Sequence, residues 1–486
     1  MSRLVSVLDR YPEYEVVIGI EIHVQLTTNT KIFCPTLNTP HAEPNEHICV
    51  ICAGYPGILP VFNGAVIDSA IAAGLAINCA ISPRSLFDRK HYFYPDLPKG
   101  YQITQQFHPI CTNGFVPIRL EDGSMKKIRV NRIHMEEDAG KNIHAEGADL
   151  SFVNLNRAGT PLLEIVSEPD ISSADEAKAY LKMLRAIVQY LGICSGNMED
   201  GAFRGDTNIS VRKKGDPKLG TKCELKNINS FKYIYDAIEY EIERQINVLI
   251  DGGTILQETR LWDSSNKRTV VMRTKEGAID YRFMPDPDLP SLDIDNAWIE
   301  RVKRTLPELP YEKFDRYLTQ NGLSVYEADI LVEDHALSTY YDEAASYTKS
   351  KGLINWILRD LIGYCNEHNL QPNACLMTPQ RIAALVDMLD QGVVNSSAAR
   401  EIFAHVLKTN IEPQDAVKEL GLTQIGSTEE LEAIVKTVIA ENPESVAQYK
   451  AGKERLFGFF VGKAMQATKG KGNPTVLTEL FKKHLV

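Results

Sequence analysis

Three consecutive acidic residues, Glu136, Glu137 and Asp138, form a dense group of potential metal ligands in the sequence. His134 precedes this group and Lys141 follows it. Closely spaced carboxylates repel one another unless water or a cation compensates their charge. Mg²⁺ favours carboxylate oxygens and keeps several waters for a phosphate-bearing ligand. The stretch therefore predicts a magnesium site, and a solvated acidic turn is the alternative.

A strand is expected over residues 14–25, where β-branched residues are frequent. Because side chains alternate across a strand, Glu21 and His23 lie on the same face of it. A carboxylate and an imidazole are costly to bury unless they are paired or bind a metal. A partly exposed strand face is the alternative interpretation.

Segment 203–210 alternates like a strand, and segment 222–230 is its expected return strand after a turn at 213–220. Each strand then presents one face that carries a carboxylate and either one or two cations. These side chains would bind a charged ligand, and faces that are only salt-bridged to each other are the alternative. The two sets are Arg204, Asp206 and Asn208, and Lys222, Glu224 and Lys226.

Cations and aromatic rings are interleaved in segment 87–105. Such a mixture suits a nucleotide or an exposed RNA end, through charge pairing and stacking. A Pro-rich turn held together by aromatic packing is the alternative. The residues are Arg89, Lys90 and Lys99 with Tyr92, Phe93, Tyr94 and Tyr101.

A turn at 156–161 carries Arg157, whose planar guanidinium suits bidentate capture of a carboxylate or a phosphate. A helix is expected soon after this turn, with Ser173 as its N-cap.

Cys49 and Cys52 form a C-x-x-C knuckle, and zinc sites combine such a knuckle with two further ligands. Cys34 is a third donor, and His41 or His47 is a candidate for the fourth. Because this ligand set is incomplete, three free thiols are the alternative to a zinc site.

The chain has 486 residues, 44% of them hydrophobic and 24% charged, which is typical of a globular protein of two to four domains. No stretch approaches the ~20 apolar residues of a membrane span. Its nine cysteines are mostly scattered singly, which indicates a reducing compartment, and we expect a cytoplasmic protein. The net charge of −11 argues against broad nucleic-acid affinity but not against a local basic path.

The sequence changes character near residue 292, after a Pro-locked acidic loop at 280–290. Helical patterns with short polar joints follow, including single helices expected over 326–347 and 445–467. A basic segment at 463–471 stands out in the acidic chain. We expect an α+β domain at 1–292, a helical domain at 293–394 and a helical tail domain at 395–486.

Several strings resemble the B subunits of the glutamyl/aspartyl-tRNA amidotransferases and occur in the order expected for that family. No one of them is a common motif, so the resemblance is specific. Zinc-binding members of the family carry C-x-C where this chain has Cys34-Pro35-Thr36. The strings are IGIEIHVQL, FDRKHYFYPDLPKGYQI, HMEEDAGK, LNRAGTPLLEIVSEPD, CELKNINSF, YRFMPDPDLP and GFFVGKAMQATKGKGNP.

The resemblance implies a cradle-shaped catalytic domain similar to that of glutamine synthetase, followed by a helical domain and a tail domain that binds tRNA. It implies ATP-dependent activation of the side-chain carboxyl group of Glu or Asp mischarged on tRNA. Ammonia would come from an amidase partner, the A subunit, and a small C subunit would support the resulting heterotrimer.

Combined with the residue patterns, the resemblance implies roles for particular side chains. Catalytic roles fall to Glu21, His23, Glu136, Glu137, Lys141, Arg157 and Glu224, of which Glu21, His23, Glu136, Glu137 and Glu224 would hold Mg²⁺. Binding of ATP falls to Arg89, Lys90, Tyr94, Lys99, Arg204, Asp206, Asn208 and Lys226. The candidate zinc ligands are Cys34, Cys49 and Cys52.

Two other classes of protein fit part of the sequence. A carboxylate–amine ligase for small molecules would not need the helical unit at 395–486. A non-catalytic RNA-binding scaffold would not need the clustered carboxylates. The sequence has no P-loop of the G-x-x-x-x-G-K-[ST] type, which agrees with a carboxylate-rich metal site.

Overall fold

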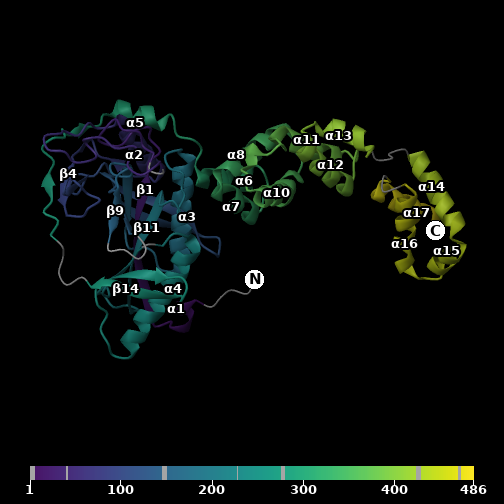
Figure 1. Cartoon of the computed structure of the whole chain (residues 1–486). Coiled ribbons are helices and arrows are strands. Elements are labelled where there is room, and N and C mark those ends of the chain that lie inside the picture. Colours follow the sequence, from purple (N-terminus) through teal and green to yellow (C-terminus); the bar gives the residue numbers. More distant parts are fainter. Residues whose placement is uncertain are drawn as a thin grey trace. The chain divides into compact units, whose positions relative to one another are not determined.

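The computed structural model describes residues 6–39, 42–144, 150–226, 228–274, 280–422, 428–468 and 472–485. The chain forms two compact units, Met1–Asn321 and Gly322–Val486 (Figure 1). The first unit combines a large sheet with helices and the second is helical in its described residues, which confirms a mixed α and β fold.

A nine-stranded sheet forms the centre of the first unit in the described residues. All neighbouring strands pair antiparallel except β12 and β13, which are parallel. The strands in spatial order are β14 (Arg268–Thr274), β13 (Glu258–Asp263), β12 (Cys223–Lys226), β11 (Phe203–Lys213), β1 (Tyr14–Gln25), β10 (Pro161–Ser167), β7 (Met125–Glu137), β6 (Cys111–Arg119) and β2 (Ala80–Ile81).

Alternation along these strands gives the sheet one apolar and one polar face. In β1 every second residue is buried and lies on the apolar face. The partly exposed residues between them, which include Glu21 and His23, lie on the polar face. The same alternation in β10 directs Glu164 to the polar face, whereas its neighbours Leu163 and Ile165 point to the apolar face and the core. The core residues of β1 are Val16, Ile18, Ile20, Ile22 and Val24.

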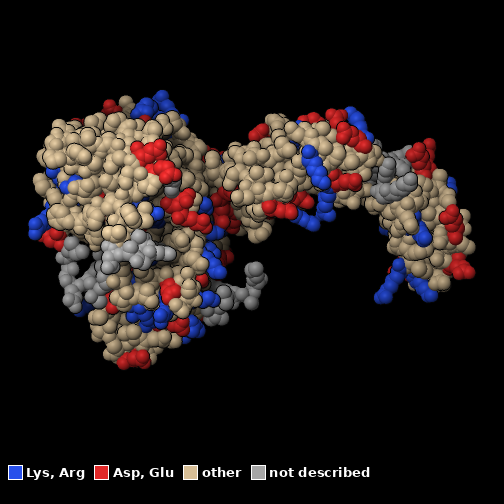
Figure 2. All heavy atoms as spheres, in the orientation of Figure 1, with Lys and Arg blue, Asp and Glu red and all other residues tan. Residues whose placement is uncertain are grey.

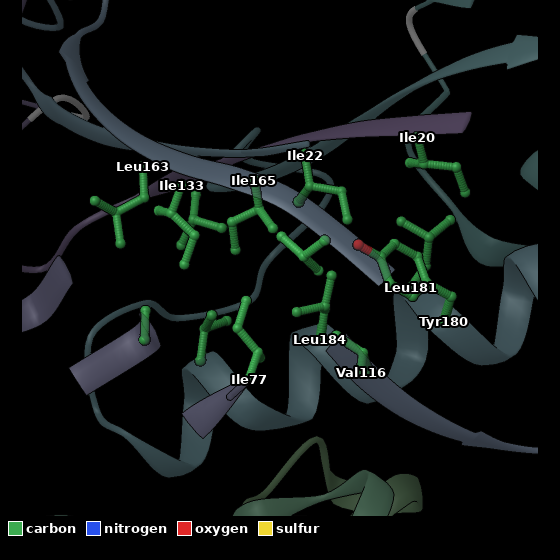
Figure 3. Packing of buried hydrophobic residues seen from close by; sticks show 14 of the residues in the cluster. Ile20, Ile22, Ile77, Val116, Ile133, Leu163, Ile165, Tyr180, Leu181 and Leu184 are labelled. Carbon is green, nitrogen blue, oxygen red and sulfur yellow. The ribbon is translucent and has the colours of Figure 1, made fainter. Parts of the chain in front are cut away.

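Helices pack on the apolar face of this sheet. Figure 3 shows Tyr180, Leu181 and Leu184 of α3 directed toward isoleucines of β1 and β10. Ser173 caps α3, because its side chain accepts a hydrogen bond from the Glu176 N–H, as the sequence predicted. The helices of the first unit are α1 (Val7–Arg10), α2 (Gly64–Ala76), α3 (Ala174–Tyr190), α4 (Phe231–Ile250), α5 (Asn296–Lys303) and α6 (Pro310–Thr319).

A buried ionic network fastens α4 to the strands at one end of the sheet. Glu241 is fully buried and accepts hydrogen bonds from Arg244 (2.6 Å) and Gln245 (2.9 Å). It also lies 3.5 Å from Arg260 of β13 and accepts a hydrogen bond from the Thr269 hydroxyl of β14 at 3.0 Å. This network holds β13, whose Thr259 contacts the polar face described below.

Glu241→Ala is expected to lower the free energy of unfolding by about 3–5 kcal/mol, because it leaves the buried Arg260 and the partly buried Arg244 without their shared carboxylate. Burial alone would raise the pKa of Glu241, but the hydrogen bond and charge of Arg244 outweigh it and lower the pKa. The contribution of Glu241 is therefore present above pH 4.5 and is lost as the pH falls. Urea unfolding at pH 7 and pH 4 should show a smaller difference between wild type and variant at pH 4.

Three small sheets surround the large one in the described residues. One of them brings the loop at 280–290 against the cation-rich segment 87–105. The strands are β15 (Met284–Pro285), β4 (Asp88–His91) and β5 (Tyr101–Thr104); β16 (Leu292–Asp293) and β3 (Arg84–Ser85); and β8 (Lys141–His144) and β9 (Ser151–Asn154).

Helices α5 and α6 follow residue 292 and belong to the first compact unit. Trp298 of α5 donates its indole N–H to Asp68 of α2 at 2.6 Å, and Arg301 pairs with the same carboxylate at 2.8 Å. The hydroxyl group of Tyr311 in α6 donates to the carbonyl group of Ala76 at 3.2 Å. The first compact unit therefore includes residues beyond the change in sequence character at 292.

The second unit consists of helices in its described residues. Two segments that the sequence predicted as single helices, 326–347 and 445–467, are each divided, and those predictions were wrong in this respect. Among the described helices, none combines the length and apolar character of a membrane span. The elements are α7 (Val325–Glu333), α8 (His335–Tyr347), α9 (Leu353–Asn355), a π-helical turn (Trp356–Leu361), α10 (Ile362–His368), a 3-10 turn (Pro372–Ala374), α11 (Pro379–Asp390), α12 (Ser396–Thr409), α13 (Pro413–Leu420), α14 (Thr428–Glu441), α15 (Pro443–Lys450), a 3-10 turn (Glu454–Leu456), α16 (Phe457–Ala467) and α17 (Pro474–Leu485).

Candidate active site

The polar face of the large sheet brings together side chains that are distant in the sequence. His23 of β1 lies opposite Glu164 of β10, and Glu164 lies opposite His134 of β7. Two pairs further along, and therefore on the same face, Leu162 of β10 lies opposite Glu136. Because these three strands are neighbours, their outward side chains form one continuous polar group.

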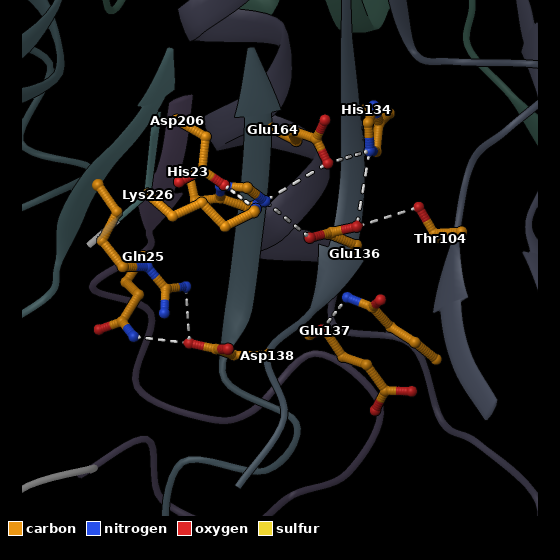
Figure 4. A network of polar contacts seen from close by, with 12 residues as sticks. His23, Gln25, Thr104, His134, Glu136, Glu137, Asp138, Glu164, Asp206 and Lys226 are labelled. Carbon is orange, nitrogen blue, oxygen red and sulfur yellow. Dashed lines mark hydrogen bonds and ion pairs between the residues drawn. The ribbon is translucent and has the colours of Figure 1, made fainter. Parts of the chain in front are cut away.

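The centre of this group is a triangle formed by His23, Glu136 and Glu164, called the His–Glu triad below. One ligand atom from each residue lies within 4.8 Å of the others, as a shared cation would require. The His23 Nε2 atom is 3.5 Å from the Glu164 carboxylate and 3.7 Å from that of Glu136 (Figure 4). The hydroxyl group of Thr104 in β5 donates to Glu136 at 3.2 Å and orients it.

His134 supports the triad from the neighbouring strand. Its Nε2 atom lies 3.1 Å from Glu164 and 3.6 Å from Glu136. Burial alone would lower the pKa of His134, but the charge of Glu164 and the hydrogen bond with Glu136 outweigh burial and raise the pKa to about 9. The carboxylates thus attract positive charge to this point.

A second carboxylate group, formed by Glu21, Asp206 and Glu224, lies on the adjoining strands β1, β11 and β12. Lys226 lies 2.5 Å from Asp206 and 3.2 Å from Glu224, and Asn208 donates to Glu21 at 3.1 Å. Burial raises the pKa of Glu21, and the charges of Glu164, Asp206 and Glu224 raise it further. The His–Glu triad and the second carboxylate group therefore act on each other electrostatically, through Glu164 of the first and Glu21 of the second.

Thr259 of β13 fixes Glu224 from behind. Its hydroxyl group is fully buried and donates to the Glu224 carboxylate at 2.9 Å. The parallel pairing of β12 with β13 sets this contact, because Glu224 and Thr259 are register partners.

Asp138 gathers cations and amides beside these carboxylates. It accepts hydrogen bonds from Gln25 at 2.8 Å and from Arg204 at 3.1 Å, and Arg157 lies 3.6 Å away. Arg157 also donates to the carbonyl groups of Ala139 (3.0 Å) and Gly140 (2.6 Å). Two guanidinium groups are thus held at the edge of the carboxylate-rich face, where they suit phosphate binding.

Glu137 lies outside the His–Glu triad, although its neighbour Glu136 belongs to it. The side chain of Glu137 is ion-paired with Lys99 and accepts a hydrogen bond from the Ile103 N–H at 3.0 Å. Figure 4 shows Glu136 turned toward His23 and Glu137 turned away. Consecutive residues of a strand face opposite sides, which explains the separation.

The predicted nucleotide-binding cations of segment 87–105 are distributed over several contacts. Arg89 forms ion pairs with Asp286 at 2.8 Å and Asp288 at 2.6 Å, and it lies over the ring of Tyr101. Lys90 lies 4.9 Å from the centre of the Tyr281 ring. Tyr94 is 59% exposed, and the side chain of Lys141 is exposed on β8. These residues do not join the carboxylate groups in the way that Arg204 and Lys226 do.

Cys34, Cys49 and Cys52 meet in the structure, and their sulfur atoms lie within 4.8 Å of one another. The Thr36 hydroxyl group lies 3.8 Å from the Cys52 sulfur and occupies the sequence position at which the resemblance implies a fourth cysteine in zinc-binding members. His41 lies outside the described residues. Among the described residues the donor set stops at three sulfur atoms, so zinc binding stays a prediction.

Sequence reasoning missed Glu164 and His134, which the structure places at the centre of the polar face. The signal was present in both cases, because Glu164 alternates with Leu163 and Ile165, and His134 is two residues from Glu136. Alternation within β7 and β10 would have placed both side chains on the face of His23 once these strands were paired.

A sheet that presents histidines, carboxylates and paired cations on one face defines a class of site with the donors and charges that a metal ion and a phosphate group would need. Comparison with known families agrees with this class, since residues 16–300 match the model of the GatB/GatE catalytic domain. Residues 339–485 match the model of the GatB domain.

The chain belongs to the family of B subunits of the aspartyl/glutamyl-tRNA(Asn/Gln) amidotransferases, which confirms the resemblance seen in the sequence. It is 51% identical over 477 residues to the B subunit of the aspartyl/glutamyl-tRNA(Asn/Gln) amidotransferase of Geotalea daltonii, covering 97% of this chain and 99% of the relative. The proteins of the same name from Syntrophotalea carbinolica and Thermodesulfovibrio yellowstonii are 49% and 47% identical. These matches cover 97% of this chain in each case, with 98% and 99% of the relatives.

Proposed function

We propose that this protein, as the B subunit of an amidotransferase complex, uses ATP to convert Glu or Asp mischarged on tRNA into Gln or Asn. The names of the relatives supply the reaction, and the polar face of the sheet supplies a site that fits it. The observation that carries the proposal is the His–Glu triad beside Glu21, Asp206 and Glu224, with Arg204 and Lys226 within reach.

The chemistry requires activation of a carboxylate, because its direct attack by ammonia would have to expel oxide. In the first step a carboxylate oxygen bonds to the γ-phosphorus of ATP and ADP leaves. In the second step ammonia attacks the acyl carbon, inorganic phosphate leaves, and one ammonia proton is released. Phosphoryl transfer asks the protein chiefly for positioning and charge neutralisation.

The carboxylate oxygens of the polar face fit Mg²⁺, for which the imidazole of His23 is a less usual ligand. Glu136, Glu164 and His23 would hold one ion, and Glu21 with Glu224 would hold a second. When bound, Mg²⁺ neutralises phosphate charge during the transfer. Lys226 forms ion pairs with both Asp206 and Glu224. It can therefore exchange one of these carboxylates for a phosphate oxygen and keep the other.

The protein's own cations complete the site. Arg204 and Arg157, held by Asp138, neutralise phosphate oxygens while the substrate carboxylate attacks. Thr104 and Thr259 keep Glu136 and Glu224 in one orientation. Lys99 and Glu137 form a polar wall at a cavity that Phe33, Tyr101 and Ile103 also line.

Ammonia must come from elsewhere, because this chain has no cysteine in a recognisable amidase setting. We propose an amidase, the A subunit of the complex, as the source, and a small C subunit as a further component of a heterotrimer. A cytoplasmic location follows from the proposed tRNA substrate.

We further propose that the first unit, which extends to Asn321, is the cradle-like catalytic domain, and that a shortened helical domain at 322–394 and the tail domain at 395–486 follow it. Helices α14, α16 and α17 have a core of their own, formed by Leu431, Val435, Phe460, Leu477 and Phe481. On the face shown in Figure 2, Lys and Arg side chains lie singly or in small groups among acidic ones. Binding of tRNA by this tail therefore depends on local contacts.

Truncation after Leu422 is expected to weaken tRNA binding while nucleotide binding by the first unit persists. This cut removes α14–α17 together with their core and leaves α12 and α13 in place against α11. Of the lysines in the basic segment 463–471, Lys463 is exposed on α16, and Lys469 and Lys471 lie outside the described residues. Removal of each phosphate contact should reduce the slope of log K against log salt by about 0.7–0.9.

The measurement is tRNA affinity across a salt series, with the truncated and full-length chains each assembled with the A and C subunits. Lys349→Ala, which removes an exposed cation that precedes the tail domain at 395–486, is the control and should keep the full slope. Equal affinity and slope for truncated and full-length complexes would assign the tail another purpose.

The function itself is tested by supplying ammonium salt in place of glutamine to the assembled complex. Amidation of mischarged tRNA should then require ATP and Mg²⁺ but no glutaminase activity. Amidation of free glutamate at a similar rate would favour a small-molecule ligase. Absence of ATP turnover with any substrate would favour a non-catalytic scaffold.

A further inference from the structure

Cys52 is the centre of a group of three thiols, called the thiol cluster below, that the proposed function does not use. Its sulfur atom lies 3.5 Å from that of Cys34 and 3.5 Å from that of Cys49. The Thr36 hydroxyl group at 3.8 Å and the Lys31 ammonium group at 3.5 Å also contact it. Two sulfur atoms, a hydroxyl group and an ammonium group therefore lie within 3.8 Å of one sulfur atom, and the ammonium group of Lys31 donates a hydrogen bond to it.

Lys31 gives this sulfur atom an unusual environment. Its side chain is fully buried, and its Nζ atom donates to the carbonyl groups of His47 (3.0 Å) and Leu155 (3.3 Å) as well as to Cys52. Lys31 has no ion pair with a carboxylate in the described part of the chain. A cationic neighbour and a place in a C-x-x-C motif both increase the reactivity of a cysteine sulfur.

A small reagent has a route to the thiol cluster. Cys34 and Cys52 line the same cavity as Lys99 and Glu137, and Cys49 is partly exposed. The cavity also borders Ile51 and Pro60 in the segment that carries the knuckle. Cys34 and Cys52 are buried like the six cysteines outside the cluster, so the cavity and the partly exposed Cys49 provide the route to the three sulfur atoms.

We propose that the thiol cluster is a site of reversible oxidation in which Cys52 forms a disulfide with Cys34 or Cys49. A low-molecular-weight disulfide, RSSR, supplies the oxidising equivalents. The Cys52 sulfur attacks RSSR, its S–S bond breaks, and one RSH leaves with the Cys52 proton. The neighbouring cysteine then attacks the Cys52 sulfur of the mixed disulfide, and the second RSH leaves with that neighbour's proton.

The geometry favours the second step because both neighbours are already close. A disulfide bond is about 2.0 Å long, so either sulfur has to approach Cys52 by about 1.5 Å, which side-chain rotation can supply. Cys52 takes part in both of the 3.5 Å sulfur contacts within the cluster. Cys52 is therefore the common partner in either product.

The second unit holds another cysteine pair, Cys365 and Cys375, which also interact with each other. For this reason the total thiol content is not a sufficient readout, and each disulfide has to be located in the sequence. The variants are made in the full-length chain with Cys365→Ser, which removes that pair and lies outside the catalytic unit.

The experiment treats this chain with glutathione disulfide, blocks remaining thiols with N-ethylmaleimide and maps the linked peptides by mass spectrometry. Cys34→Ser and Cys49→Ser should each still form a disulfide to Cys52, since one neighbour at 3.5 Å remains. Cys52→Ser should slow disulfide formation within the cluster about tenfold or more. Dithiothreitol should restore the thiols in every case.

Two results would overturn the proposal. The first is equal disulfide formation in the Cys52→Ser variant and in the chain that retains Cys52, since it would remove the central role of Cys52. The second is a full equivalent of zinc in protein purified without chelator, together with resistance of all three thiols to glutathione disulfide. A zinc content well below one equivalent, with a mapped disulfide to Cys52, supports the proposal.

Discussion

Glu164→Gln is expected to lower the rate of ATP-dependent amidation by at least about 100-fold. Loss of a residue that merely supports a metal ligand typically costs 10–100-fold, and Glu164 is itself placed as a ligand. It lies between His23 at 3.5 Å and His134 at 3.1 Å, so glutamine would keep the size of the side chain but remove the charge that attracts a cation. The measurement is amidation of mischarged tRNA across a Mg²⁺ series.

Glu168→Gln is the matched control for this variant. Glu168 directly follows β10, the strand of Glu164, and its carboxylate accepts a hydrogen bond from Asn131 at 2.8 Å. The control should retain nearly the full rate because Glu168 is outside the His–Glu triad. Wild-type rates for Glu164→Gln at every Mg²⁺ concentration would remove Glu164 from the site.

Arg204→Gln is expected to lower kcat/KM for ATP by about 10²-fold, the typical cost of removing one donor that stabilises developing charge. Arg204 projects from the polar face of β11 beside Asp206, and its Nη2 atom donates to Asp138 at 3.1 Å. Glutamine removes the positive charge that a phosphate group would meet. Initial rates at varied ATP with saturating mischarged tRNA give the value.

Arg212→Gln controls for loss of a cation from the same face of the same strand. Arg212 pairs with Glu15 at 2.6 Å, near the other end of β1, whereas Arg204 lies opposite His23. An unchanged kcat/KM for Arg212→Gln with a large loss for Arg204→Gln would locate the phosphate-binding end of the sheet. Equal small effects would show that Arg204 does not contact ATP.

Strong local patterns allowed parts of the fold to be predicted from the sequence. The β-branched run at 14–25 is β1, Phe203 begins β11, and the cap at Ser173 begins α3. These signals are contained within short segments, so they do not depend on tertiary contacts. Strand order was out of reach, because β1 pairs with β10 and β11, which are more than a hundred residues away.

Helix interruptions were harder to predict than helices. Asp334 lies inside the periodic segment 326–347 but ends α7 and caps α8, because its side chain accepts a hydrogen bond from the Leu337 N–H. Gly452 adopts a φ of +99° between α15 and α16, a conformation that glycine tolerates better than other residues. Apolar periodicity continues across both breaks, so pattern alone favoured single helices.

The candidate site was predicted in its components but not in its grouping. The acidic stretch suggested that Glu136 and Glu137 act together, yet strand alternation sends Glu137 to Lys99. Glu164 looked unremarkable in sequence because its partners, His23 and His134, lie on other strands. A site assembled across three strands depends on register, which single-sequence patterns do not specify.

The central claim is that this face activates the side-chain carboxylate of the aminoacyl group by transferring a phosphoryl group to it. Mischarged tRNA carrying oxygen-18 in both side-chain carboxyl oxygens tests this claim most directly, in the assembled complex with ATP and ammonium salt. We expect each amide formed to release inorganic phosphate containing one oxygen-18 atom, because the bridging oxygen leaves with phosphorus. Unlabelled phosphate, released while the amide forms at the normal rate, would contradict it.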